Sequence, residues 1–136
     1  EYIPSEYPAV ADVDVVYALR AAAREFGVEP YVGIIRSHDA FYLESPGAHE
    51  GWRERIQPWT DAGVLAVENE SSSLFVVSSL LGGVRAGTIL LAGNSLYNAY
   101  GSMCTSNDDG YAERVDLMTK ITLRAIEMID KLDDLK

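Results

Sequence analysis

The chain has 136 residues and a formal net charge of −10, from 11 lysines and arginines against 21 aspartates and glutamates. Nucleic-acid binding requires clustered cations, and the few cations here are spread along the chain, so no nucleic-acid partner is expected. No apolar run approaches the roughly 18 residues of a membrane span, and no secretory signal segment is visible. The single cysteine, Cys104, cannot form an internal disulfide, which favours a reducing, cytoplasmic setting.

The length predicts one domain, residues 1–136. By surface scaling, a folded chain of this mass exposes about 7,000 Å² and buries roughly two thirds of its unfolded surface. Hydrophobic residues make up 48% of the sequence, which excludes disorder as the main state and is enough for one core.

The first helix is predicted over residues 12–26, where apolar side chains recur at spacings of three and four. Asp12 is placed to cap its start, and Gly27 is placed to end it. A β-branched run at residues 31–36 predicts a buried strand. The polar segment 37–51, which contains proline and glycine, predicts a functional loop.

The alternation of helices and strands continues to the end of the chain. A helix is predicted over residues 52–62, although it contains Pro58, and a second buried strand over residues 64–68. The remaining elements are predicted to be a helix, a third buried strand, a loop and a long amphipathic helix, over residues 71–81, 85–92, 93–110 and 111–132. This order predicts an α/β fold of three layers, α/β/α, with a central mostly parallel or mixed sheet covered on both faces.

In such folds, ligands bind at the carboxyl ends of the strands. Strand alternation would put Glu68 and Glu70 on one side and Asn69 on the other. Two carboxylates near a buried strand end are costly to desolvate without partners. A polyhydroxylated ligand supplies such partners, because one carboxylate can accept from two vicinal hydroxyls. A metal ion is the alternative, with His38 and Asp39 as its further candidate ligands.

Several segments resemble those of a known enzyme family. Residues 63–75, GVLAVENESSSLF, look like the signature of nucleoside phosphorylases of the uridine phosphorylase and bacterial hexameric purine nucleoside phosphorylase type. Residues 39–42, DAFY, resemble the D-x-F-Y motif of that family, and residues 59–63 resemble the lead-in to its signature. Residues 6–12 and 85–87 also fit. The resemblance covers nearly the whole chain but corresponds to the C-terminal half of a family member, which implies that this chain is part of a longer one.

The resemblance implies a pentosyltransferase that transfers the pentosyl group of a nucleoside, favoured to be a pyrimidine nucleoside such as uridine, to phosphate. It implies inorganic phosphate as co-substrate, no other cofactor, no metal and a dimer-based homohexamer. The phosphate ligands would lie in the missing N-terminal half and on a neighbouring subunit, so that this chain alone would be inactive. Arg36 is the only arginine at a predicted strand end, and its simpler interpretation is a surface charge.

The resemblance also implies roles for individual residues. Glu70 matches the glutamate that holds the ribose 2′- and 3′-hydroxyls, although a helix N-terminus would also favour a carboxylate there. Phe41 matches an aromatic that packs on base or sugar, with core packing as the alternative. Glu68 would orient its neighbours. Asn69 stands where the family usually has methionine beneath the ribose. Asn94 falls near the aspartate that protonates a leaving purine, and an asparagine can donate a hydrogen bond but cannot supply a proton.

These departures keep other functions open. Asn94 argues against a nucleosidase and against the usual bacterial purine mechanism. The Gln-x-Arg motif that reads uracil has no counterpart, because residues 43–47 are LESPG, although Ser95, Tyr97 or His38 could contact a base. The alternatives are therefore a catalytically impaired nucleoside-binding or assembly module, and a purine nucleoside phosphorylase.

Overall fold

The structure is a computed structural model that describes residues 3–40, 50–92 and 110–133. In the described residues it contains helices and a small parallel sheet, in the order α1 (Val13–Glu25), β1 (Ile35–Ser37), α2 (Trp52–Asp61), β2 (Ala66–Glu68), α3 (Ser71–Leu81) and α4 (Tyr111–Asp133). The four predicted helices are confirmed to within one or two residues at each end. Across the described ranges, no helix combines the length and the apolar character that crossing a membrane requires.

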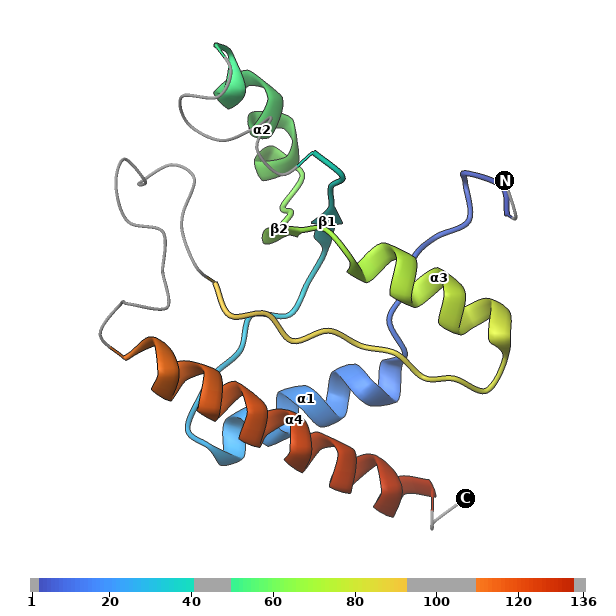
Figure 1. Cartoon of the computed structure of the whole chain (residues 1–136), viewed down its shortest axis with the longest axis vertical. Coiled ribbons are helices and arrows are strands. Elements are labelled where there is room, and N and C mark those ends of the chain that lie inside the picture. The colour runs from blue at the N-terminus through green and yellow to red at the C-terminus, as the bar shows by residue number, and fades with distance from the viewer. Residues whose placement is uncertain (1–2, 41–49, 93–109, 134–136) are drawn as a thin grey trace.

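The sheet lies between α2 and the α1–α4 pair (Figure 1). β1 and β2 pair in parallel, with Ile35 opposite Ala66 and Ser37 opposite Glu68. α1 and α4 pack against each other below the sheet, α3 contacts β1, and α2 lies at the opposite end of the molecule from the α1–α4 pair. The extended segment 84–92 runs between the sheet and the α1–α4 pair.

Local sequence explains both ends of α1. The Asp12 carboxylate accepts hydrogen bonds from the backbone N–H of Asp14 at 2.9 Å and of Val15 at 3.2 Å, which is the expected N-cap. At the other end, Gly27 has φ of 76°. The backbone N–H of Gly27 reaches the carbonyl of Arg24, and the N–H of Val28 reaches that of Ala23. These two bonds form the Schellman motif that ends many helices.

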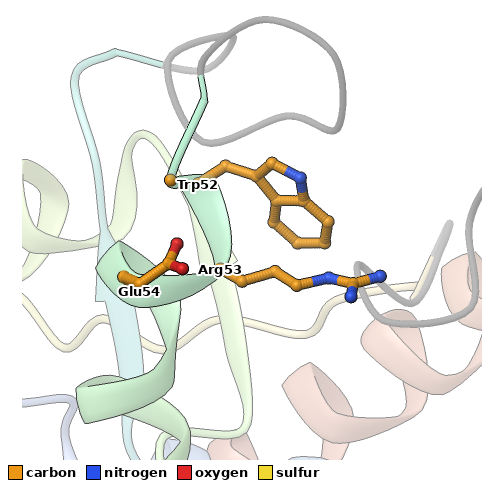
Figure 2. Close-up of a pocket in the computed structure, with 4 residues that line it drawn as sticks. Trp52, Arg53 and Glu54 are labelled. Carbon is orange, nitrogen blue, oxygen red and sulfur yellow. The ribbon is translucent and has the colours of Figure 1, made fainter.

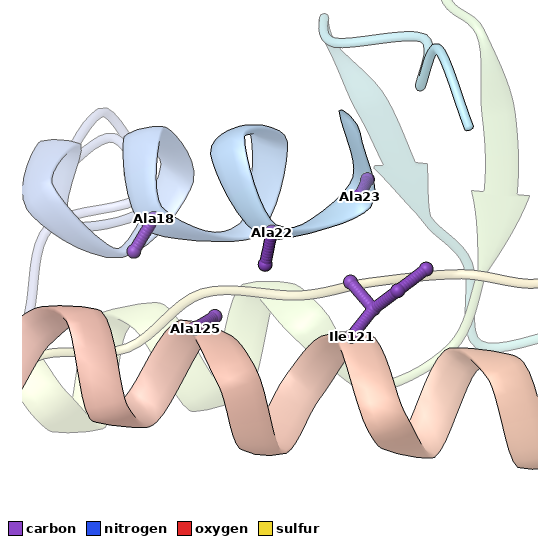
Figure 3. Close-up of a cluster of buried hydrophobic side chains, with 5 residues drawn as sticks. All are labelled: Ala18, Ala22, Ala23, Ile121 and Ala125. Carbon is purple, nitrogen blue, oxygen red and sulfur yellow. The ribbon is translucent and has the colours of Figure 1, made fainter. Parts of the chain in front are cut away.

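The core lies between α1 and α4 and is built mainly from small side chains (Figure 3). Its buried members are alanines of α1 together with one isoleucine and one alanine of α4: Ala18, Ala22, Ala23, Ile121 and Ala125. Facing alanines allow the two helix backbones to approach closely. At the rim, the Arg124 guanidinium donates to both carboxylate oxygens of Glu25, at 2.7 and 3.2 Å, and this interaction joins the two helices.

The third predicted strand, residues 85–92, is wrong: this segment is extended but belongs to no strand ladder. Its contacts run to helices instead. The Ala86 carbonyl accepts from the N–H of Asp12 at 2.8 Å, and Ile89 packs against the α1–α4 core. A side chain at Gly87 would clash with Val15, so the glycine permits this close approach to α1. Because the segment lies on helices, its backbone does not reach the ladder groups of β1 or β2.

The prediction of a sheet buried on both faces is also wrong for the described residues. β1 and β2 are half-buried or exposed, and the apolar side chains leading into them are open: Tyr31 is 94% and Ile34 67% exposed. The whole chain exposes 9800 Å², against the roughly 7,000 Å² expected of a compact domain of this mass. The physical reason is that these apolar surfaces meet no covering layer among the described residues.

α3 has the same property. It carries no charged residue, yet several of its large apolar side chains are exposed, namely Leu74, Val77, Leu80 and Leu81. A helix without charged residues that carries several large apolar side chains is typical of a buried position. The exposed side chains Leu74, Val77, Leu80 and Leu81 therefore form an open apolar surface on α3.

The α1–α4 contact yields a test of packing. Ala22 is fully buried in it, whereas Ala21 on the same helix is exposed. We expect Ala22→Leu to lower the free energy of unfolding by about 1–3 kcal/mol through overpacking. The matched change Ala21→Leu should alter it by less than about 0.5 kcal/mol. Denaturant midpoints of the two variants provide the measurement, and equal midpoints would contradict the close α1–α4 packing.

Candidate functional site

The polar residues at the ends of β1 and β2 meet at the start of α3. The parallel register puts Ser37 and Glu68, the last residues of the two strands, opposite each other. α3 begins only three residues after Glu68, at Ser71. Three elements thus come together at one point, as expected for the carboxyl edge of a parallel sheet.

Glu68 is the centre of this junction. One carboxylate oxygen, Oε2, accepts hydrogen bonds from the backbone N–H of Glu70 at 2.8 Å and of Ser71 at 2.6 Å. The other oxygen, Oε1, accepts a hydrogen bond from the Ser37 hydroxyl. The same hydroxyl accepts from the backbone N–H of Ser72 at 2.8 Å. Glu68 and Ser37 together satisfy backbone donors that a helix N-terminus otherwise leaves without partners.

The electrostatics of Glu68 follow from these contacts. Desolvation of the carboxyl raises its pKa, but the hydrogen bonds from Ser37, from the N–H groups of Ser71 and Glu70 and from the Ser71 side chain together lower it. The pKa of Glu68 therefore lies below its usual value. The protein itself supplies the hydrogen-bond partners of this carboxylate.

Glu70 has a different environment. It occupies the N-cap position of α3 but makes no side-chain capping hydrogen bond. The residue is exposed, and its carboxylate accepts one long hydrogen bond, 3.3 Å, from the N–H of Asn69. The structure therefore separates the two glutamates, since Glu68 is bonded to the fold whereas Glu70 is presented at the surface.

Asn69 and His38 join the two strand ends further. The N–H of His38 donates to the Glu68 carbonyl at 2.8 Å. In the amide orientation that satisfies both of its ends, Asn69 Nδ2 donates to the His38 carbonyl at 2.6 Å. His38 Nδ1 accepts from the N–H of Ala40 at 2.7 Å, and its side chain is only 7% exposed. His38 thus stabilises the turn after β1, and the amide of Asn69 is bonded to the backbone.

A second group of charged and aromatic side chains lies on α2 and on Arg36 of β1. Arg36 of β1 lies over the Trp59 ring of α2, 4.4 Å from its centroid, so this cation is engaged by an aromatic face. At the start of α2, a cavity of about 270 Å³ is lined by Gly51, Trp52, Arg53 and Glu54. Figure 2 shows Arg53 extending beside the Trp52 ring, 5.0 Å from its centroid. This cavity does not include Glu68 or Glu70.

Other sequence predictions cannot be placed. Phe41 and Asn94 lie outside the described residues, as do Ser95 and Tyr97. Among the residues that the structure does describe, no three histidine, cysteine, aspartate or glutamate side chains converge as metal ligands.

Three hydroxyl residues of this junction, Ser37, Ser71 and Thr88, were given no role by the sequence analysis. Ser37 links β1 to Glu68 and α3, and the Oγ atoms of Ser71 and Thr88 lie 3.0 Å apart, which links α3 to the segment 84–92. The strand register, which pairs Ser37 with Glu68, was the signal that would have found Ser37. A single sequence does not contain that register.

Comparisons with known proteins agree on one family. The sequence profile of the phosphorylase superfamily matches residues 1–127. The chain is 39% identical over 95 residues to a uridine phosphorylase of Haemophilus influenzae. The aligned region covers 65% of this chain and 37% of that protein. It is 36% identical over 129 residues to a guanosine phosphorylase of Halorubrum lacusprofundi, which covers 92% of this chain and 50% of that protein.

A third relative is a DeoD-type purine nucleoside phosphorylase of Caldanaerobacter subterraneus, 31% identical over 116 residues, which covers 85% of this chain and 47% of that protein. The chain thus spans half or less of the length of these three relatives.

The lowered pKa of Glu68 gives a test of the junction. Its folded pKa lies below the usual value of 4.5, so its hydrogen bonds contribute stability above that pH, and the contribution disappears as pH falls through the folded pKa. We expect Glu68→Gln to lower the free energy of unfolding by about 1 kcal/mol near neutral pH. The difference from the wild type should shrink in acid. Denaturation curves at about pH 7 and about pH 3 provide the measurement, and a difference independent of pH would contradict the role of the charge.

Proposed function

Since the chain belongs to the phosphorylase superfamily, we propose that the protein containing it is a pentosyltransferase that carries out nucleoside phosphorolysis. An oxygen of inorganic phosphate forms a bond to the anomeric carbon of the sugar while the glycosidic bond breaks. The electron pair leaves with the nucleobase, which takes up a proton. No further cofactor is needed for this exchange. The enzyme must hold the sugar and stabilise the oxocarbenium-like transition state.

The observation that carries the proposal is the separation of the two glutamates. Glu68 is occupied by Ser37 and the N-terminus of α3, whereas Glu70 is exposed beside it. Glu70 lies at the start of α3, where the positive end of the helix dipole attracts anionic groups. An ionised carboxylate accepts from two neighbouring hydroxyls at once. We assign Glu70 to the ribose 2′- and 3′-hydroxyls.

The remaining site residues are assigned around this contact. Asn69, directly before Glu70, lies close enough along the chain to border the sugar, although its amide is bonded to the backbone of the turn. Phe41 would pack on base or sugar, and Asn94 would donate a hydrogen bond to the base. Asn94 cannot act as the acid that protonates the base, so the proton must come from another group or from water.

The nucleobase is proposed to be a pyrimidine such as uracil. The support is the match to uridine phosphorylases, such as that of Haemophilus influenzae. Guanine, the base of guanosine, is the second candidate, because the guanosine phosphorylase of Halorubrum lacusprofundi matches over 92% of this chain.

We further propose that residues 1–136 are the C-terminal part of a longer chain that assembles as a dimer-based hexamer in the cytoplasm. The open apolar surfaces of α3 and of the residues next to the strands support the longer chain and its assembly, because such surfaces are usually covered. The remainder of the chain would complete a three-layer α/β/α fold and supply phosphate ligands. The intact mass of the natively expressed protein tests this, with a mass well above 14.9 kDa expected; a native product of that mass would oppose it.

The activity itself is tested with a nucleoside panel. We expect the intact protein to release free base from uridine or guanosine only when inorganic phosphate is present. Release without phosphate would indicate a nucleosidase. Tight nucleoside binding with no release under either condition would instead support a binding module that has lost turnover.

The sugar contact is tested by Glu70→Gln. Loss of charge-assisted bonds to two hydroxyls should lower kcat/KM by about 100-fold while the fold is retained. Glu113→Gln is the matched control, because Glu113 is also an exposed carboxylate in the first turn of a helix. Steady-state kinetics with circular dichroism provide the measurement. Wild-type kinetics in Glu70→Gln would remove Glu70 from the site.

A further inference from the structure

We infer that Ser37 is a positioning residue for the sugar-binding carboxylate, because its hydroxyl fixes the turn that presents Glu70. This inference rests on the proposed role of Glu70 in holding the ribose hydroxyls. Ser37 would touch no substrate, and it would act through Glu68 and the first turn of α3.

The hydroxyl of Ser37 joins three elements at a single atom. Ser37 is the last residue of β1, and its Oγ donates to Glu68 Oε1 at the end of β2. The same Oγ accepts from the N–H of Ser72 in the first turn of α3, at 2.8 Å. A serine hydroxyl has one donor and two acceptor positions, and here its donor and one acceptor position are both used.

These bonds restrain the backbone on both sides of Glu70. At Glu70 itself, the backbone N–H donates to Glu68 Oε2 at 2.8 Å. In the two residues that follow Glu70, the N–H of Ser71 donates to the same oxygen at 2.6 Å, and the N–H of Ser72 donates to Ser37 Oγ. Because Ser37 also donates to the other oxygen of Glu68, it restrains the rotation of the carboxylate on which the other two bonds depend.

Removing the hydroxyl should loosen the turn without dissolving α3. Ser72 would lose the acceptor of its N–H, and one oxygen of Glu68 would lose its donor. The two bonds from Glu68 Oε2 and the contact between Ser71 and Thr88 would remain. The grip of Glu70 on the sugar hydroxyls should weaken more than the rest of substrate binding, because that grip depends on the exact direction of one side chain.

The experiment compares a ribonucleoside with its 2′-deoxy counterpart in the intact protein. The deoxy substrate lacks one of the two hydroxyls that Glu70 is proposed to hold. The kcat/KM for the ribonucleoside divided by the kcat/KM for the 2′-deoxynucleoside therefore reports that contact. We expect Ser37→Ala to lower kcat/KM for the ribonucleoside by about 10-fold or more and to lower the ratio, with the KM for phosphate unchanged. Ser37→Thr, which keeps the hydroxyl, should restore most of both values.

A matched control lies on α3. The Ser79 hydroxyl donates only within its own helix, to the Phe75 carbonyl at 2.9 Å, so Ser79→Ala should leave both kcat/KM values unchanged. If Ser37→Ala fails to fold, Ser37→Cys replaces it, because a thiol of similar size is a weak donor and the same fall in the ratio is expected. Equal losses for both nucleosides would overturn the inference. A residue that only stabilises the fold changes the fraction of protein that is active, and this lowers both kcat/KM values by the same factor.

A second readout separates this inference from the proposed function. If the wild-type protein releases no base from any nucleoside, the proposed function fails, and amide hydrogen exchange then tests the role of Ser37 in the turn. Faster exchange at Ser71 and Ser72 in Ser37→Ala, with exchange in α1 unchanged, supports control of the turn by Ser37. Unchanged exchange at these two amides overturns it.

Discussion

The arrangement of the candidate site depends on one carboxylate that is bonded entirely to the protein. Glu68 ends β2, faces Ser37 across the sheet and holds the first N–H groups of α3. A buried or half-buried carboxylate is stable only when hydrogen bonds replace its water, and the start of a helix offers several donors that need an acceptor. The two requirements satisfy each other. The result is a fixed angle between the sheet and α3, and therefore a fixed position for every residue of the connecting turn.

That fixed turn gives two neighbouring glutamates different physical roles. Glu68 exchanges its hydration for backbone N–H groups, and its pKa falls below the usual value because these bonds outweigh desolvation. Glu70, two residues later, keeps its exposure and contacts mainly its own turn. A ligand with vicinal hydroxyls can therefore reach Glu70 without displacing any contact that holds the fold. Such an arrangement suits the sugar-binding step of a phosphorylase, in which the protein must be organised before the substrate arrives.

The open surfaces of the chain fit its place in the phosphorylase superfamily. The core described here is mostly a contact between α1 and α4, whereas α3, which has no charged residue, and the residues before β1 and β2 expose large apolar side chains. Apolar surface of this extent is favourable only when it is covered. The chain spans half or less of its relatives, and the remaining length is the cover that we propose.

The sequence by itself determined the four helices, the caps of α1 and the placement of Glu68 and Glu70 at a strand end, because helix periodicity, capping and glycine conformation are local properties. It did not determine the third strand, since residues 85–92 have the composition of a strand but lie against α1 and α3, and a ladder needs a neighbouring backbone in register. It did not reveal Ser37, whose importance depends on pairing with a residue 31 positions away. Only the tertiary structure decided which glutamate is bonded to the fold and which is exposed, because that difference depends on the donors that distant segments bring to each carboxylate.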